Sequence, residues 1–215
     1  MGAITRSIAN NITTSGVFTS SAITNNSVTG ITVLPNAEDG ITFISSQTAS
    51  NSASLSFTSG LTSTYKAYKF VFSSIHPRTD NVAFQFNMST DAGSNYNVTK
   101  TTTYFVAYHA ESDVEADIGY QSSLDLAQST SYQNLISFLG NGADESGSGT
   151  LNFFNPSSTT YVKHFISRCD RYSAGDYSVD EFVAGYGNTT SAVNAIRFQM
   201  SSGNFDGTIY LYGIK

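Results

Sequence analysis

Hydrophobic and polar residues alternate along most of the chain after residue 40, in short runs separated by turn residues. In the clearest run, every second residue is apolar from Val82 to Met88. A period of two places alternate side chains on opposite faces of a β-strand, so each run has one dry face and one wet face. About ten such runs follow one another at a spacing of roughly 8–15 residues. The pattern therefore predicts an all-β protein.

Sheets with one dry face must bury that face against another layer. We therefore expect two antiparallel sheets packed as a β-sandwich, jelly-roll-like in connectivity, with another Greek-key sandwich as the alternative. Two segments do not follow the pattern. Residues 110–133 are compatible with a short helix or a long loop, and residues 140–149 are typical of a flexible glycine-rich loop.

Residues 1–36 differ from the rest of the chain. Arg6 is the only charged residue before Glu38, and single apolar residues are widely spaced among Ser, Thr and Asn. Such a stretch buries too little surface to fold alone, so it is either a disordered tail or an arm that orders against a partner. We expect an extended attachment arm at 1–36 and a sandwich domain at 37–215. The expected partner-binding anchors of the arm are Ile8, Ile12, Val17, Phe18, Ile31 and Val33.

Composition excludes several classes of protein. Charged residues make up 12% of the chain, about half the usual share, and the net charge is −6. The ten Lys and Arg residues are scattered, which argues against nucleic-acid binding. The apolar runs are too short to cross a bilayer, and the N-terminus lacks the apolar segment of a signal peptide, so synthesis in the cytoplasm is expected. Cys169, the single cysteine, is expected to be a buried apolar residue.

Residues capable of catalysis or metal binding do not form known motifs. His76, His109 and His164 lack metal-ligand spacing, and no Gly-x-Ser-x-Gly segment is present. We expect no enzyme activity, no cofactor and no metal. The acidic segment 111–117 carries four carboxylates at alternate positions. A solvated loop is the expectation for it, and a calcium site stays open as an alternative.

Tyrosine is the more informative residue type, because the chain has 13 Tyr and no Trp. An exposed Tyr offers a flat apolar face and a hydroxyl, which suits sugar rings or protein interfaces. Packing in the core or at its rim is the alternative for each one. Seven tyrosines are predicted in or beside loops and strand ends: Tyr104, Tyr108, Tyr120, Tyr132, Tyr172, Tyr177 and Tyr186. The expected host-contact residues in the two irregular segments are Tyr120, Tyr132, Asp144 and Glu145.

Several stretches of the body resemble a domain found in virion proteins of marine tailed bacteriophages. They are LSFTSGLTSTY (55–65), SIHPRTD (74–80), DAGSNY (91–96), GTL and NPSSTT (149–151 and 155–160), AGY (184–186), MSSGNFDG (200–207) and IYLYG (209–213). Together they extend over most of residues 53–215, and residues 1–13 also resemble the start of small phage structural proteins. The resemblance implies a place in the phage particle, as a tail fibre, a fibre tip or a capsid decoration. It carries no catalytic residues over to this chain.

Three functional hypotheses follow. The first is a non-enzymatic virion component, assembled in the host cytoplasm, whose arm binds another capsid or tail protein and whose sandwich projects outward toward the host surface. A homo-oligomer is expected, and a trimer is suggested by analogy with fibres. The second is a carbohydrate-binding, lectin-like domain that contacts host surface glycan. The third, and least favoured, is a glycan hydrolase.

Overall fold

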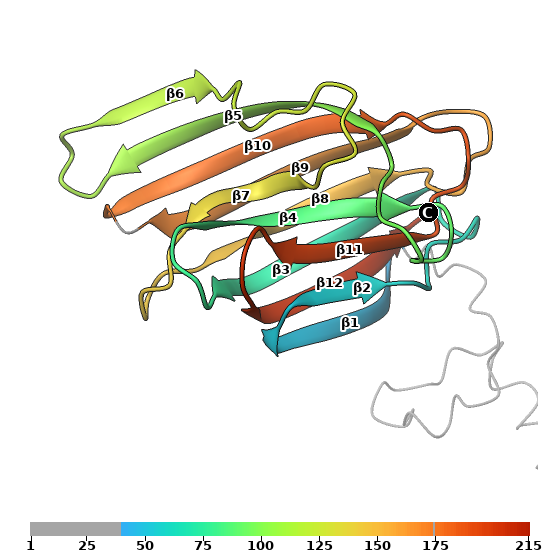
Figure 1. The fold of residues 1–215 in the computed structure, drawn as a ribbon, viewed down its shortest axis with the longest axis horizontal. Coiled ribbons are helices and arrows are strands. Elements are labelled where there is room, and N and C mark those ends of the chain that lie inside the picture. The colour runs from blue at the N-terminus through green and yellow to red at the C-terminus, as the bar shows by residue number, and fades with distance from the viewer. Residues whose placement is uncertain (1–39, 174) are drawn as a thin grey trace, which may run out of the picture. The chain divides into compact units, whose positions relative to one another are not determined.

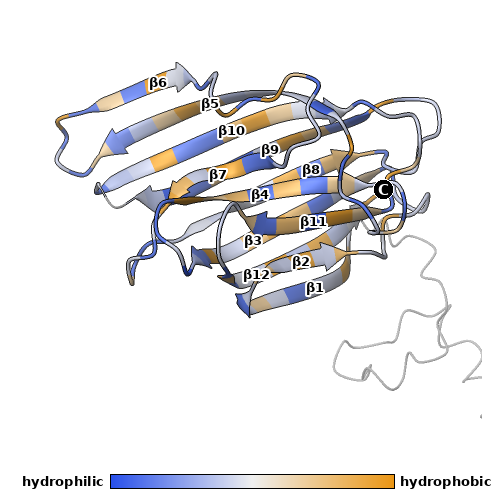
Figure 2. Ribbon diagram, viewed as in Figure 1, coloured by the Kyte–Doolittle hydropathy of each residue, from blue (hydrophilic) through white to orange (hydrophobic). Residues whose placement is uncertain are grey.

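The computed structural model describes residues 40–173 and 175–215, and these contain β-strands and no helix (Figure 1). The two-residue alternation leaves one face apolar in most strands, as the alternating colours along the strands in Figure 2 show. The described part of the chain forms twelve strands: β1 (Ile41–Ser52), β2 (Ser54–Phe57), β3 (Ala67–Pro77), β4 (Val82–Ser89), β5 (Lys100–Ala110), β6 (Ala116–Tyr120), β7 (Gln133–Leu139), β8 (Gly147–Phe154), β9 (Lys163–Ser173), β10 (Tyr177–Gly187), β11 (Ala195–Met200) and β12 (Phe205–Ile214).

These strands form two antiparallel sheets. The large sheet has the order β1-β12-β3-β8-β9-β10-β5-β6, and the small sheet has the order β2-β11-β4-β7. The two sheets pack face to face, with the core between them. The predicted β-sandwich is thereby confirmed.

The connectivity is that of a jelly roll with insertions. If β5, β6, β9 and β10 are set aside, two four-stranded sheets remain, β1-β12-β3-β8 and β2-β11-β4-β7. Among these eight strands the first pairs with the last, the second with the seventh and the fourth with the fifth, which is the pairing of a jelly roll. The predicted jelly-roll-like fold is therefore confirmed, and the Greek-key alternative is not needed.

The four inserted strands widen the large sheet on one side. β5 and β6 are inserted between the fourth and fifth jelly-roll strands, and β9 and β10 between the sixth and seventh. β10 pairs along its whole length with both β9 and β5, without a register shift. The large sheet consequently extends beyond the edge of the small sheet, and this overhang positions the pocket described below.

Phenylalanine dominates the core. Phe198 on β11 is fully buried and its ring lies within 5.2–6.4 Å of five others, measured between ring centroids: Phe57, Phe70, Phe72, Phe84 and Phe86. The Phe57 and Phe72 rings meet Phe198 edge to face, Phe70 and Phe86 are tilted against it, and Phe84 stacks on it. The partner rings come from β2, β3 and β4, where they occupy every second position on the buried face of their strand. The two-residue period therefore brings all these rings into the core.

The irregular segments are partly structured. Residues 110–133 contain β6 instead of a helix, followed by a loop whose Leu126 carbonyl accepts a hydrogen bond from Thr102 on β5. The predicted loop 140–149 ends early, because β8 begins at Gly147. Residues 1–36, the predicted arm, lie outside the described residues, as do the anchors named for it.

Candidate ligand-binding pocket

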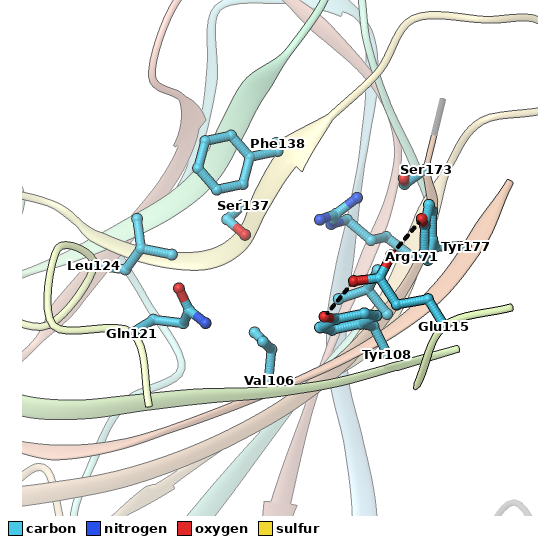
Figure 3. Close-up of a pocket in the computed structure, with 11 residues that line it drawn as sticks. Val106, Tyr108, Glu115, Gln121, Leu124, Ser137, Phe138, Arg171, Ser173 and Tyr177 are labelled. Atoms are coloured by element: carbon cyan, nitrogen blue, oxygen red, sulfur yellow. Dashed lines mark hydrogen bonds between the residues drawn. The ribbon is translucent and has the colours of Figure 1, made fainter. Parts of the chain in front are cut away.

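A pocket of about 350 Å³ lies where the large sheet extends past the edge of the small one. β7, the last strand of the small sheet, packs over β9 and β10, whereas β5 and β6 continue beyond it. Eleven residues from β5, β7, β9, β10 and the segments on either side of β6 line the pocket (Figure 3). They are Val106, Tyr108, Glu115, Gln121, Leu124, Ser137, Phe138, Arg171, Ser173, Tyr177 and Val179.

The floor of the pocket is held by a buried ion pair. Arg171 Nε donates to Glu181 Oε1 at 2.8 Å, and Glu181 is fully buried. The Glu181 carboxylate also accepts from the Ser137 N–H at 2.9 Å, from the Ser137 hydroxyl at 3.1 Å and from the Tyr104 hydroxyl. Its oxygens are thus filled by donors of the protein itself, which fixes the direction of the Arg171 side chain.

Burial changes the ionisation of both partners of this pair. Burial raises the pKa of Glu181 well above its ordinary value, and the backbone N–H of Ser137 acts in the opposite direction. Burial lowers the pKa of Arg171 to about 10, so the guanidinium keeps its charge at neutral pH. Breaking one partner of such a pair leaves an uncompensated buried charge, which typically costs about 3–5 kcal/mol. The pair therefore acts as a rigid support for the pocket.

A β-bulge in β7 shapes one wall. Val82 pairs with Leu139 and Phe84 with Ile136, so Ser137 and Phe138 together span a register shift. Phe138 has a φ of 44° and is 55% exposed, a backbone conformation that an L-residue with a bulky side chain seldom adopts. The bulge turns the Ser137 N–H inward to Glu181 and leaves the Phe138 ring at the pocket rim.

The opposite wall carries a carboxylate held between two tyrosines. Tyr108 on β5 donates to Glu115 Oε1 at 3.0 Å, and Tyr177 on β10 donates to Glu115 Oε2 at 2.9 Å. These bonds raise the pKa of both tyrosine hydroxyls. The two rings meet edge to face with centroids 5.8 Å apart. Each Glu115 oxygen keeps further lone-pair capacity for a ligand hydroxyl.

The acidic segment 111–117 does not gather its carboxylates. Asp113 contacts His109 at 3.1 Å, Glu115 faces the two tyrosines, and Asp117 accepts from the backbone of Ile118. In the part of the chain that the structure describes, no group of three or more His, Cys, Asp or Glu side chains is arranged to hold a metal ion. All residues of this segment are exposed, which agrees with the expected solvated surface.

The four predicted host-contact residues lie in three different segments, with only Asp144 and Glu145 adjacent, and none lines the pocket. Tyr120, 55% exposed, is on the edge strand β6 and donates to Asp125, whereas Tyr132 precedes β7 and is half-buried beside Arg197. Asp144 is exposed in the loop before β8.

Glu145 requires a correction. Its side chain is only 7% exposed, and its carboxylate accepts a hydrogen bond from the Gly142 N–H at 2.5 Å. A Cβ atom on Gly140 or Gly142 would collide with this carboxylate, so the two glycines make room for it. Glu145 therefore serves the loop's own structure, and its assignment as a host-contact residue is withdrawn.

Two of the seven tyrosines predicted near loops and strand ends belong to the pocket. Tyr108 and Tyr177 line it, whereas Tyr104 is fully buried and bonds to Glu181. Arg171, Glu181 and Phe138 were not predicted. A signal for the ion pair was present, because Glu181 occupies the same strand face as Val179 and Val183, and Arg171 the same face as Cys169. A charge at a core position of an alternating strand indicates a buried, partnered group.

The histidines occupy separate places. His76 Nδ1 lies 2.6 Å from the Glu145 carbonyl, His109 faces Asp113, and His164 lies beside the Tyr186 ring. Cys169 is buried, as expected, and burial raises its pKa to about 12.

Comparison with known proteins identifies no relative. Within residues 40–173 and 175–215 there is also no helix long and apolar enough to cross a membrane. No family model, no curated protein and no solved structure matches this chain.

Proposed function

We propose that this chain is a non-enzymatic structural component of a tailed-bacteriophage virion, in which residues 1–36 attach a jelly-roll body to a larger particle. The resemblance of residues 53–215 to virion proteins of marine tailed phages supports the proposal. The jelly roll is a fold that viral capsid proteins and lectins both use. The proposal includes other capsid or tail proteins as partners and a self-associated state such as a trimer.

One observation supports the proposal that residues 1–36 serve attachment while the rest of the chain forms the body. All twelve described strands come from residues 41–214, and β1 pairs directly with β12, so the chain's first and last described strands complete the large sheet together. Removal of residues 1–36 takes away none of the twelve described strands. In the proposal, the segment binds another protein by inserting its apolar side chains or by pairing with an exposed strand edge.

The first test uses purified phage particles and a variant that lacks residues 2–36. Antibody against the body should label particles that contain the full chain, while the shortened chain should stay soluble and folded but be missing from particles. As a control, residues 1–36 fused to an unrelated soluble protein should carry that protein onto particles. Particles that incorporate the shortened chain normally would show that attachment lies elsewhere. Particles that lack the full chain altogether would refute the virion proposal.

The pocket favours a second function, glycan binding by the projecting body. Its lining combines aromatic faces from Tyr108, Tyr177 and Phe138 with the charged groups of Glu115 and Arg171. Sugar rings have apolar faces and polar edges, and aromatic side chains with a few fixed polar groups are suited to both. The pocket volume lies at the lower end of the range of about 300–1,000 Å³ seen for small-molecule sites.

Binding of the full chain to host surface polysaccharide tests this second function. Tyr177→Ala should weaken binding by at least about tenfold, because it removes an aromatic face and releases Glu115. Tyr161→Ala is the matched control, since Tyr161 is 69% exposed and does not line the pocket. If both variants lose the same amount of polysaccharide binding, the pocket is not the binding site. Release of reducing ends from the polysaccharide would overturn the non-enzymatic assignment.

A further inference from the structure

The two charged walls of the pocket have opposite hydrogen-bonding character. In the described part of the chain, the Arg171 guanidinium donates through Nε to Glu181, and its remaining N–H groups face the pocket (Figure 3). Arg171 therefore presents donors to a ligand. Glu115 on the facing wall presents only acceptors, and two tyrosine hydroxyls hold its orientation.

Such a pair of walls is complementary to hydroxyl groups. A hydroxyl both accepts and donates, so two neighbouring hydroxyls on one ring can accept from Arg171 and donate to Glu115 at the same time. Hydrogen bonds to charged groups are stronger than those between neutral groups. Gln121 and Ser173 add further polar side chains to the lining.

The charge of the pocket disfavours an anionic ligand. Arg171 contributes one positive charge, while Glu115 and Glu181 contribute two negative charges, a sum of −1. Protonation of Glu181 would bring this sum only to zero. Burial lowers the pKa of Arg171, whereas the charges of Asp170 and Glu145 act in the opposite direction, so further acidic groups lie close enough to affect this guanidinium.

Apolar contacts complete the site. The bulge holds the Phe138 ring at the rim, and Leu124, Val106 and Val179 supply aliphatic surface beside it. A C–H face of a pyranose ring can pack on such a surface while its hydroxyls point to the charged walls.

We propose that this pocket binds a neutral saccharide through two adjacent ring hydroxyls, which bridge Arg171 and Glu115. The inference rests on the proposed glycan binding and adds the ligand class and the residues that select it. Uronic acids and other acidic sugars should bind more weakly, because the pocket carries no net positive charge to attract a carboxylate, and deoxy sugars that lack one of the two hydroxyls lose half of the bridge.

The test compares ligands and variants on the full chain by saturation-transfer NMR and calorimetry. The ligands are methyl glycosides of neutral hexoses, the matching uronic acids and the matching monodeoxy sugars. At least one neutral glycoside should bind, and its uronic acid and deoxy partners should bind at least about tenfold more weakly. Glu115→Gln keeps the size of an exposed side chain and should weaken binding of the neutral glycoside by a similar factor. Tyr161→Ala should leave this binding unchanged.

The outcomes separate this inference from the proposal beneath it. If Glu115→Gln and Arg171→Lys bind host polysaccharide as well as the wild type does, the inference is overturned. Glycan binding would then belong to another surface of the protein. Tighter binding of the uronic acid than of its neutral partner would overturn the charge argument and with it the inference. Failure of every saccharide, including host polysaccharide, would overturn glycan binding itself. Because Glu115 is exposed, its variant should fold even if Arg171→Lys does not.

Discussion

At the residue scale, buried charges are the distinctive feature of this molecule. Lys100, Lys163, Arg171 and Glu181 are all buried, although only 12% of the chain is charged. Arg171 and Glu181 neutralise each other. The two lysines are held by uncharged oxygens instead, and Lys100 Nζ donates to Asn87 Oδ1 at 2.6 Å and to the Val98 carbonyl at 2.8 Å. Uncompensated burial of this kind makes protonation unfavourable.

Lys100 predicts a pH dependence of stability. Burial lowers its pKa from 10.5 to about 7, so between these values the unfolded chain binds a proton that the folded chain does not. The free energy of unfolding should therefore fall as pH decreases from about 10 to 7. The slope contributed by Lys100 should approach about 1.4 kcal/mol per pH unit.

Lys100→Met removes the titrating group and should flatten this dependence in urea unfolding at pH 7, 8 and 9. The buried partner Asn87 Oδ1 keeps the Met88 N–H as a donor, so the variant should still fold. Lys66→Met, at an exposed lysine, is the control and should keep the wild-type slope. If the free energy of unfolding depends on pH in the same way for wild type and Lys100→Met, the pKa of the Lys100 amine is not lowered by burial.

At the element scale, the bulge in β7 links the core to the pocket. It directs Ser137 toward Glu181 and leaves Phe138 exposed with a positive φ. Strain of this kind persists where surrounding structure determines it, and it occurs often at binding sites. The bulge depends on the buried Glu181 carboxylate on the facing strand, because this carboxylate receives the Ser137 N–H that no longer bonds within the small sheet.

Glycine and alanine substitutions at Phe138 test this geometry. At an ordinary strand position Gly is less stable than Ala by about 0.5–1 kcal/mol. At Phe138 the order should reverse, with Phe138→Gly more stable than Phe138→Ala by about 1 kcal/mol, because Gly adopts a positive φ without strain. Chemical denaturation measures the difference. The same pair at Ile166, exposed on regular β9, should show the ordinary order, and an ordinary order at Phe138 would contradict the bulge.

At the scale of the whole molecule, the two sheets form one cooperative core. Phenylalanine rings from both sheets interlock around Phe198, and the large sheet is continuous from β1 to β6. Cys169 lies near its middle, in register with Gly149 and Glu181 on the neighbouring strands. Local opening at an edge strand would therefore leave Cys169 covered.

Cys169 should report global unfolding. Its thiol is buried and its pKa is raised to about 12, and both the lack of access and the small thiolate fraction suppress reaction. Alkylation by iodoacetamide at pH 8 should be negligible in buffer and should rise with urea along the same transition as tyrosine fluorescence. Rapid labelling in buffer, before that transition, would show that β9 opens locally.

The strand pattern was predictable because it is local. Runs such as Val82 to Met88 carry a period of two that only a strand with one buried face explains, and enough of them imply two stacked sheets. The secondary structure of residues 110–133 was not predictable, because β6 is only five residues long and its side chains are mostly exposed. Its place is set by pairing with β5 rather than by its own composition.

The sequence by itself determined the fold class, through alternation, and the chemistry available, through its many tyrosines and few charges. The tertiary structure alone decided which of these residues meet. Tyr108, Glu115, Phe138, Arg171 and Tyr177 are up to 69 positions apart in the chain, and strand register and one bulge bring them around a single pocket. The local pattern determines which face of a strand each side chain takes, but it does not determine which distant strands become neighbours, because that depends on contacts between residues far apart in the chain.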